Sequence, residues 1–232
     1  AIERDMDVVR ALGIDVPEGK MPEIFLRNDE LSGADQWLSA HHVKAPILGL
    51  GLGASRPTKI WPIERFSAVA TRWIKETGGS VIALTGPGEA HLADEFQVWL
   101  NDALIHSDLD PKKVDEIKKH VYCPAPLDLR DAVALMSRMD LLLCNDSGLK
   151  HVAIARKTPT MTLIGPEHPF EWHPYPQDLY PYLFVDNLAC RRDALPGMPP
   201  WCALEVCTVE KHKCMKQITV DQVIGELLRL KK

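Results

Sequence analysis

The sequence predicts an α/β protein with a parallel sheet covered by helices on both faces, and two observations carry this prediction. Short apolar runs rich in Leu and β-branched residues alternate with amphipathic segments from residue 46 onward. Strands buried on both faces read as continuous apolar runs, and their alternation with helices is typical of right-handed β–α–β units. The expected sheet is Rossmann-like, and such sheets bind ligands beyond the carboxyl ends of their strands.

Apolar runs mark the expected strands. The main predictions are PILGL (46–50), SVIALT (80–85), DLLLC (140–144) and PTMTLIG (159–165), with HVYCPA (120–125) and YLFV (182–185) as shorter candidates. The segments between them predict helices. PIERFSAVATRWIKETGG (62–79) opens with a Pro at a favoured first-turn position and closes with two Gly. The amphipathic segments EAHLADEFQVWLNDAL (89–104) and LDLRDAVALMSRM (127–139) predict two more helices.

These boundaries divide the chain into three regions. Residues 1–45 hold an amphipathic helix (about 2–13), an irregular stretch and a second helix near 30–42, and we expect them to be connecting helices. Residues 46–189 are expected to form the Rossmann-like domain. Residues 190–232 are expected to form a Cys-rich loop and a last helix, VDQVIGELLRL, which a Thr caps.

Composition and charge exclude several classes of protein. With 46% hydrophobic and 25% charged residues, the 232-residue chain has the composition of an ordinary globular protein. A net charge of −5 offers no bulk attraction to nucleic acid, so no nucleic-acid partner is expected. No apolar run approaches the roughly 18 residues that span a bilayer. AIERDMDVVRALG has no signal-peptide core, so a cytoplasmic location is expected.

Two groups of residues raise the question of a metal. The four late cysteines have 11, 4 and 6 residues between them, whereas structural zinc sites use close pairs, so reduced thiols in a Pro-rich loop are expected. These residues are Cys190, Cys202, Cys207 and Cys214. The acidic tripeptide DLD (108–110) precedes a Pro and a helical pattern, which favours helix capping over metal binding. No metal and no cofactor are therefore expected.

The stretch NDSGLKHVA (145–153) raises the sharpest functional question, because it joins a buried strand to a helix. In one interpretation, Asp146 or Ser147 caps the helix by accepting a hydrogen bond from its orphan N–H groups. In the other, those N–H groups and the positive end of the helix dipole bind an anion such as phosphate. The turn by itself leaves both interpretations open.

Three other turns are expected at the same edge of the sheet. GLGASRPTKIWP (51–62) is Gly-rich, but it has neither a Walker A ending nor G-x-G-x-x-G, and its Lys59 would lie at the ligand end of the sheet. TGPGEAH (85–91) places Glu89 at a helix start, where the dipole stabilises a carboxylate. The functional alternative is a carboxylate that accepts hydrogen bonds from ribose hydroxyls or an adenine amine. GPEHPFEWHPY (165–175) is the last of these turns.

In this order and spacing, the segments resemble glycosyltransferase family 9, the bacterial lipopolysaccharide heptosyltransferases. The matching segments are GASRPTKIWP, LTGPGE, LDLRDAVALMSRMDLLLCNDSGLKHVAIA, TLIGPEHPFEW and HKCMKQITVDQVIGELL. The resemblance implies a two-domain GT-B fold, of which residues 46–232 are the C-terminal, donor-binding half. It also implies that an N-terminal domain supplies the acceptor site and the catalytic base. Residues 1–45 resemble the tail of that domain, so this chain is expected to be inactive alone.

The resemblance also implies roles for individual residues. Asp146 is expected to orient the transferred sugar or pair with Lys59, and Lys59 is expected to neutralise charge on the departing diphosphate. These two are the expected catalytic residues. The residues expected to bind the substrate are Ala54, Ser55, Glu89, Ser147, Gly148, Leu149 and His151. Two positions depart from the family pattern: Ala54 has no hydroxyl for a phosphate, and Lys150 either adds charge near the phosphates or solvates a helix face.

The function implied is transfer of heptose from ADP-heptose to a lipopolysaccharide core acceptor, with inversion at the sugar carbon and without a metal. The expected partners are the nucleotide sugar and, through the N-terminal domain, a lipid-linked saccharide at the inner membrane. Two alternatives remain at this point. One is another GT-B enzyme, such as a sugar-nucleotide 2-epimerase. The other is a binding module that keeps nucleotide affinity without chemistry.

Overall fold

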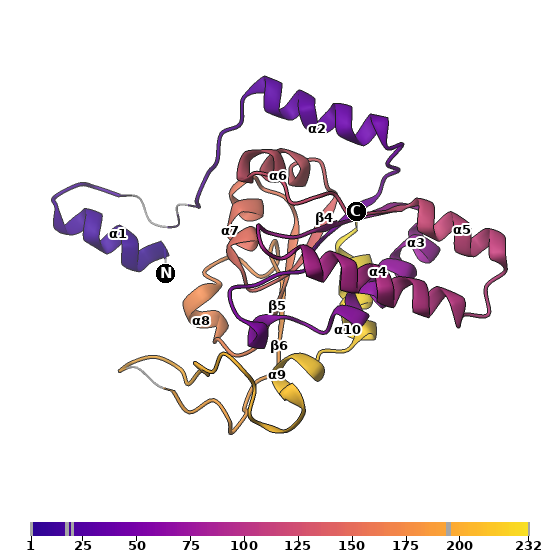
Figure 1. The fold of residues 1–232 in the computed structure, drawn as a ribbon. Helices are drawn as coiled ribbons and strands as arrows, with labels where there is room; N and C mark the ends of the chain where they lie inside the picture. Colours follow the sequence, from indigo (N-terminus) through magenta and orange to yellow (C-terminus); the bar gives the residue numbers. More distant parts are fainter. Residues whose placement is uncertain (1, 17–18, 20, 194–195, 232) are drawn as a thin grey trace.

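A six-stranded parallel sheet forms the centre of the molecule (Figure 1). The structure is a computed structural model, and it describes residues 2–16, 19, 21–193 and 196–231. The strand order is β3–β2–β1–β4–β5–β6, and every neighbouring pair is parallel. This is the doubly wound order of dinucleotide-binding sheets, so the predicted fold class is confirmed. The strands are β1 (Ile47–Gly51), β2 (Ser80–Leu84), β3 (Val121–Tyr122), β4 (Leu141–Asn145), β5 (Thr160–Ile164) and β6 (Tyr182–Phe184).

The helices predicted from the sequence are present, including the two at the N-terminal end. The α-helices that the structure describes are α1 (Ile2–Ala11), α2 (Asn28–Ala40), α3 (Ile63–Thr77), α4 (Ala90–Ile105), α5 (Pro111–Lys119), α6 (Leu129–Met136), α7 (Gly148–Ala155), α8 (Pro169–Trp172), α9 (Lys213–Lys216) and α10 (Val220–Leu230). The short helices α8 and α9 were not predicted. Asp110 caps α5 by accepting hydrogen bonds from the N–H groups of Lys112 and Lys113, which confirms capping as the role of the DLD tripeptide. Thr219 caps α10, as predicted.

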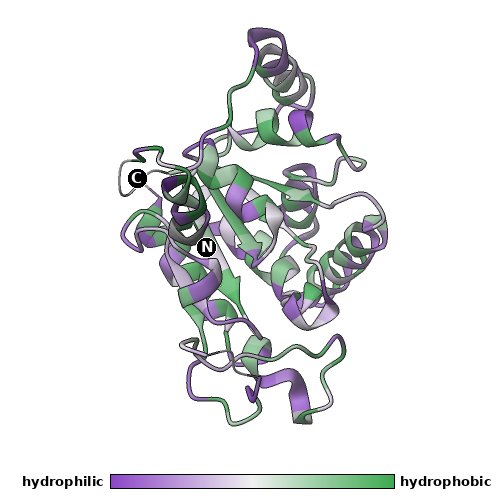
Figure 2. Cartoon of the chain, turned by 90° about the vertical axis from the view of Figure 1, so that its left-hand side faces the viewer, coloured by the Kyte–Doolittle hydropathy of each residue, from purple (hydrophilic) through white to green (hydrophobic). Residues whose placement is uncertain are grey.

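Two hydrophobic clusters cover the two faces of the sheet, because side chains alternate along each strand. Leu141 and Leu143 of β4 join the larger cluster, with α3, α4 and α10. Leu142 and Cys144 join the other, with residues of α6 and α7. Figure 2 shows the strands as a hydrophobic band through the middle of the chain. The last helix, α10, packs against α3 and therefore shares the core of the sheet.

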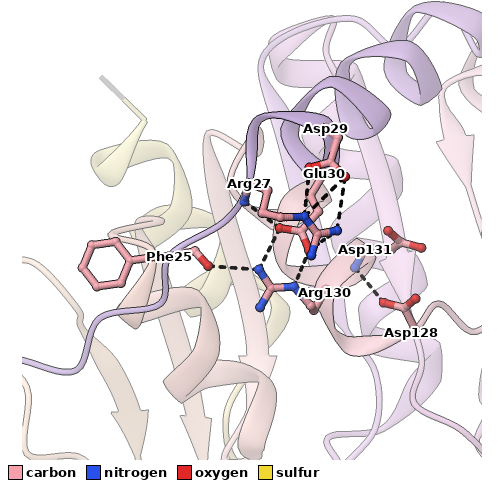
Figure 3. A network of polar contacts seen from close by, with 7 residues as sticks. All are labelled: Phe25, Arg27, Asp29, Glu30, Asp128, Arg130 and Asp131. Carbon is pink, nitrogen blue, oxygen red and sulfur yellow. Dashed lines mark hydrogen bonds and ion pairs between the residues drawn. The ribbon is translucent and has the colours of Figure 1, made fainter.

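Helix α2 lies across α6, at the top of the view in Figure 1, and a network of charged groups joins the two helices (Figure 3). Arg130 of α6 forms an ion pair with Glu30 of α2 and donates a hydrogen bond to the Phe25 carbonyl at 3.1 Å. Arg27 lies on the other side of Glu30, with its Nη2 3.3 Å from a carboxylate oxygen. No described helix is both long and apolar enough to cross a bilayer.

Candidate functional site

The strand order opens a crevice at the carboxyl edge of the sheet, between β1 and β4. These strands are neighbours, but the helices that follow them pack into different clusters: α3 on one face and α7 on the other. Two chain segments therefore diverge at this point, and ligands of open α/β sheets bind in the resulting crevice. The turns 51–62 and 145–148 both begin there.

Asn145 ties these two turns together from the inside. It is fully buried at the end of β4. Its Oδ1 accepts a hydrogen bond from the Trp61 N–H at 2.9 Å, and its Nδ2 donates to the Leu52 carbonyl at 2.8 Å. A buried amide whose donor and acceptor are both satisfied holds one geometry, because any shift would leave a polar atom unpaired. Asn145 thus positions the turn that carries Lys59 relative to Asp146.

A chain of five charged side chains runs along this edge of the sheet: Arg56, Glu167, Lys59, Asp146 and Lys150. Nζ of Lys59 lies 3.1 Å from Oδ2 of Asp146 and 3.6 Å from Oε1 of Glu167. Lys150 pairs with the other oxygen of Asp146, and Arg56 pairs with Glu167. Each of the five side chains is at most 11% exposed. The predicted pair of Lys59 and Asp146 is therefore present, within a larger chain of ion pairs.

This ionic chain carries an excess of positive charge. Three cations and two carboxylates leave a net charge of +1. Burial alone would raise the pKa of Asp146, but Lys150 and Lys59 together outweigh burial and hold this pKa below its usual value. Asp146 is therefore ionised at neutral pH. A partly desolvated group of charges with one cation in excess attracts an anion.

Lys150 does not solvate a helix face, so that alternative is wrong. Its side chain is fully buried, and Nζ donates to Asp146 and to the Trp172 carbonyl at 2.7 Å. Helical spacing brings Lys150 over Asp146, four residues earlier in the chain. The buried position decides its role, because an ammonium group at this depth needs a carboxylate partner.

A pocket of about 330 Å³ opens beside the ionic chain. Its walls come from the turns after β1, β2 and β4, and from the segment between β3 and α6. It brings together six of the residues predicted to bind the substrate. They are Ala54, Ser55, Glu89, Ser147, Gly148 and Leu149. Most of the remaining lining is apolar, as is usual in small-molecule sites with a few polar groups.

Glu89 lies at the start of α4 and faces the turn after β1. Its Oε2 accepts a hydrogen bond from the Gly86 N–H at 2.8 Å. A Cβ at Gly53 would come within 2.0 Å of the same oxygen. Only glycine leaves room for the carboxylate here, which explains one of the alternating glycines of the first turn. The carboxylate is thus held on the pocket wall, where it can also accept hydrogen bonds from a ligand.

The first turn of α7 presents backbone N–H groups to the same pocket. Ser147 is the N-cap, with an extended backbone, and its side chain accepts no capping hydrogen bond. Ser147, Gly148 and Leu149 line the pocket. The orphan N–H groups at the start of a helix, together with its dipole, favour a negatively charged ligand. Ser147 therefore does not cap the helix through its side chain, and the interpretation in which this turn binds an anion remains.

His151 lies apart from the pocket lining. It shares a hydrogen bond with the hydroxyl of Tyr175. Burial, followed by the charge of Lys150, lowers the pKa of His151 to about 4, so the ring is neutral at pH 7. Its predicted contact with a pyrophosphate would therefore be a hydrogen bond from a neutral ring, without charge.

Sequence reasoning missed Arg56 and Glu167. Both lie in turns that were singled out, 51–62 and 165–175, so their place at the ligand edge was visible. Their pairing spans 111 residues, and it depends on the order of strands in the sheet, which local patterns do not reveal.

The four late cysteines surround a cavity of only about 20 Å³, together with Arg191. All are free thiols, and Cys214 is buried. Burial raises the pKa of the Cys214 thiol to about 11. Within the described part of the chain, no three His, Cys, Asp or Glu side chains are arranged to hold a metal ion.

Comparison with known proteins gives the family. The family model described as glycosyltransferase family 9 (heptosyltransferase) matches residues 1–183. Lipooligosaccharide heptosyltransferase 2 of Campylobacter jejuni (strain 81116 / NCTC 11828) is 28% identical over 185 residues, which cover 79% of this chain and 51% of that protein. The chain thus spans about half the length of this relative.

Solved structures share the fold. The ADP-heptose lipopolysaccharide heptosyltransferase II of E. coli superimposes with a TM-score of 0.65 at 23% identity, covering 93% of this chain and 55% of that one. The E. coli heptosyltransferase WaaC, solved with ADP, superimposes with a TM-score of 0.56 at 14% identity, covering 96% of this chain and 53% of that one. With the family model matching most of its length, this chain belongs to glycosyltransferase family 9, the heptosyltransferase family.

Proposed function

We propose that this chain forms the nucleotide-sugar donor site of an inverting glycosyltransferase that moves heptose from ADP-heptose to a lipopolysaccharide core acceptor. The observation that carries the proposal is the ionic chain, which places one excess buried positive charge beside the pocket and the start of α7. A nucleoside diphosphate would supply the missing negative charge. Its nucleoside would occupy the pocket, with ribose hydroxyls or an adenine amine donating to Glu89.

In this proposal, Lys59 and the first turn of α7 stabilise the departing diphosphate. Negative charge grows on the leaving phosphate as the glycosidic bond breaks, and a preorganised cation and N–H groups lower the barrier without reorganising. Asp146 is acceptor-only when ionised and has lone pairs beyond those that its two lysines use. It can therefore orient a sugar hydroxyl while it holds Lys59 in place. Because Lys59 supplies the positive charge at the leaving diphosphate, the chemistry does not need a metal ion.

The acceptor and the catalytic base are assigned, in the same proposal, to a further N-terminal domain of the full protein. Support comes from the relatives, which are about twice as long as the part that this chain matches. The lipid-linked saccharide, and any contact with the inner membrane, would belong to that domain. This chain alone would bind the donor and would not turn it over. The WaaC structure with ADP supports adenine as the nucleobase of the donor.

The test is calorimetric titration of this chain with ADP, UDP and GDP, each with and without EDTA. We expect ADP to bind most tightly, with an affinity that EDTA leaves unchanged. Lys59→Ala should weaken ADP binding, because the excess buried cation is then lost. A preference for UDP or GDP would overturn the assignment of the donor, and an EDTA-sensitive affinity would overturn the metal-free site. In the full-length protein, unchanged transfer by Asp146→Ala would refute its catalytic role.

A further inference from the structure

A second, larger cleft of about 510 Å³ opens on the loops beyond β5. Two tryptophans, two carboxylates, a histidine and a methionine contribute to its walls. They are Trp172, Trp201, Glu167, Glu171, His168 and Met198. None of the site residues predicted from the sequence lines it, and Glu167 is the one member of the ionic chain among its lining residues.

The cleft adjoins the ionic chain through Glu167, which belongs to both. Each of the two cations that pair with this carboxylate also lies near one of the tryptophans. Nζ of Lys59 is 5.9 Å from the centroid of the Trp172 ring, and Cζ of Arg56 is 6.0 Å from that of Trp201. The reacting end of the proposed donor would lie at Lys59. The ionic chain therefore contributes Glu167 to the cleft and lies beside the nucleotide pocket, although the two cavities share no lining residue.

The backbone holds both tryptophans in place. Trp201 pairs with Asp193 through two main-chain hydrogen bonds, of 2.8 and 3.1 Å. The next residue, Cys202, donates its N–H to the Pro166 carbonyl at 3.0 Å and accepts from Arg56 at 3.3 Å. The Trp172 carbonyl accepts from the buried Lys150. The aromatic walls are thus anchored to the same charged groups that form the proposed donor site.

We propose that the Trp172–Trp201 cleft binds a sugar ring of the transfer reaction. A pyranose presents C–H groups on its faces, which pack against the negative face of an indole, and hydroxyls on its rim, which donate to carboxylates. Tryptophans beside Glu167 and Glu171 match both requirements. An acyl chain fits less well, because it has no hydrogen-bond donor to offer the carboxylates that it would cover. The inference rests on the proposed function for the sugar's source, which is the donor heptose or a saccharide of the acceptor that reaches this cleft from the N-terminal domain.

The experiment measures binding of three probes by calorimetry: ADP, ADP-heptose and a deacylated lipopolysaccharide core oligosaccharide. The variants are Trp172→Ala, Trp201→Ala and the conservative Trp201→Phe. Trp99→Ala is the matched control, because Trp99 on α4 is 40% exposed, as is Trp172. Urea midpoints show that each variant is folded. We expect both Ala variants in the cleft to weaken sugar binding about tenfold, with Trp201→Phe retaining most of it.

The probes separate the two sources of the sugar. Loss of oligosaccharide affinity in the cleft variants assigns the cleft to the acceptor. Loss of the difference between ADP-heptose and ADP assigns it to the donor sugar. ADP affinity itself should change by only about two- to threefold, because the Ala variants keep Lys59, Arg56 and the Trp172 carbonyl and lose only the two cation–π contacts.

The inference is overturned if neither sugar affinity depends on Trp172 or Trp201, if Trp99→Ala has the same effect, or if the wild-type chain binds neither sugar while it binds ADP. Failure of ADP to bind would instead refute the proposed donor site. Sugar binding that still depends on the two tryptophans would leave the cleft assignment standing.

Discussion

At the scale of single residues, Asp146 is the group on which the candidate site depends. Each of its oxygens pairs with a different lysine, and the side chain is 4% exposed. An ion pair this deep is weak evidence for stability by itself, because desolvation offsets much of the attraction. Removing only one partner is different, because it leaves a buried charge without compensation. The site thus couples the stability of the fold to the charge that binds the ligand.

Asp146→Asn should therefore destabilise the protein by about 3–5 kcal/mol, because Lys59 and Lys150 would lose their shared counter-charge. The measurement is the free energy of unfolding in urea. Asp35→Asn is the matched control, since Asp35 also forms an ion pair, with Arg138, but its side chain is 56% exposed. It should unfold nearly as the wild type does. Equal destabilisation by the two substitutions would contradict the role assigned to the buried chain.

A second residue-scale prediction concerns Gly53, where a Cβ would collide with the Glu89 carboxylate. Gly53→Ala should leave the protein folded, because the end of a flexible side chain can move, but Glu89 would leave the Gly86 N–H. We expect ADP affinity to fall about tenfold, the order of one charge-assisted hydrogen bond. Gly33→Ala on α2 is the control, because nothing lies within 4 Å of its added Cβ. Unchanged ADP binding by Gly53→Ala would remove Glu89 from the donor site.

At the scale of elements, the docking of α2 depends on the network in Figure 3. The hydrogen bond from Arg130 outweighs burial and lowers the pKa of Glu30 to about 2, from an ordinary value of 4.5. A carboxyl whose pKa is lower in the folded protein stabilises it above the ordinary pKa. That contribution is lost as the pH falls toward the folded value. The ion pair between Glu30 of α2 and Arg130 of α6 is thus intact at neutral pH and weakens in acid.

We therefore expect α2 to loosen as the pH falls from about 4.5 to about 2, while the central strands do not. Backbone amide signals of α2, followed by nuclear magnetic resonance, would report this change. In Glu30→Gln, the same signals should show no such dependence on pH. Glu226→Gln on α10 is the control: it removes an ion pair with Arg229 within one helix, and α2 should respond in this variant as in the wild type. A pH response of α2 that survives in Glu30→Gln would contradict the claim that the Glu30–Arg130 ion pair holds α2 against α6.

At the scale of the whole molecule, one sheet separates two clusters that draw on nearly every element. The larger cluster takes residues from α3, α4 and α10, and the smaller takes residues from α2, α6 and α7. Because β1 and β4 contribute to both, neither cluster can be lost while the other keeps its packing. The ligand crevice lies between these same two strands.

The protein should therefore unfold in a single transition, and a donor bound across the crevice should stabilise all of it. ADP at 100 times its dissociation constant is expected to raise the free energy of unfolding by about 2.7 kcal/mol. Calorimetric unfolding with and without ADP measures both effects. Two separate transitions, or a shift confined to one of them, would show that the clusters are independent.

Much of this architecture was predictable because its signals are local. Apolar runs marked all six strands, and caps such as those of α5 and α10 marked helix ends. Turns that follow parallel strands lie at one edge whatever the strand order, so Ala54, Ser55, Glu89 and Ser147 were expected near one another, and one pocket brings them together.

The sequence by itself thus determined the strands, the main helices and the edge of the sheet at which Lys59 and Asp146 lie, with their pairing as one of two alternatives. Only the tertiary structure decided that Lys150 is buried, that Arg56 and Glu167 complete the ionic chain, and that Trp172 and Trp201 share a cleft. These contacts join residues up to 111 positions apart, as for Arg56 and Glu167. The physical reason is that burial and charge pairing depend on which strands are neighbours, and strand order is a property of the whole chain.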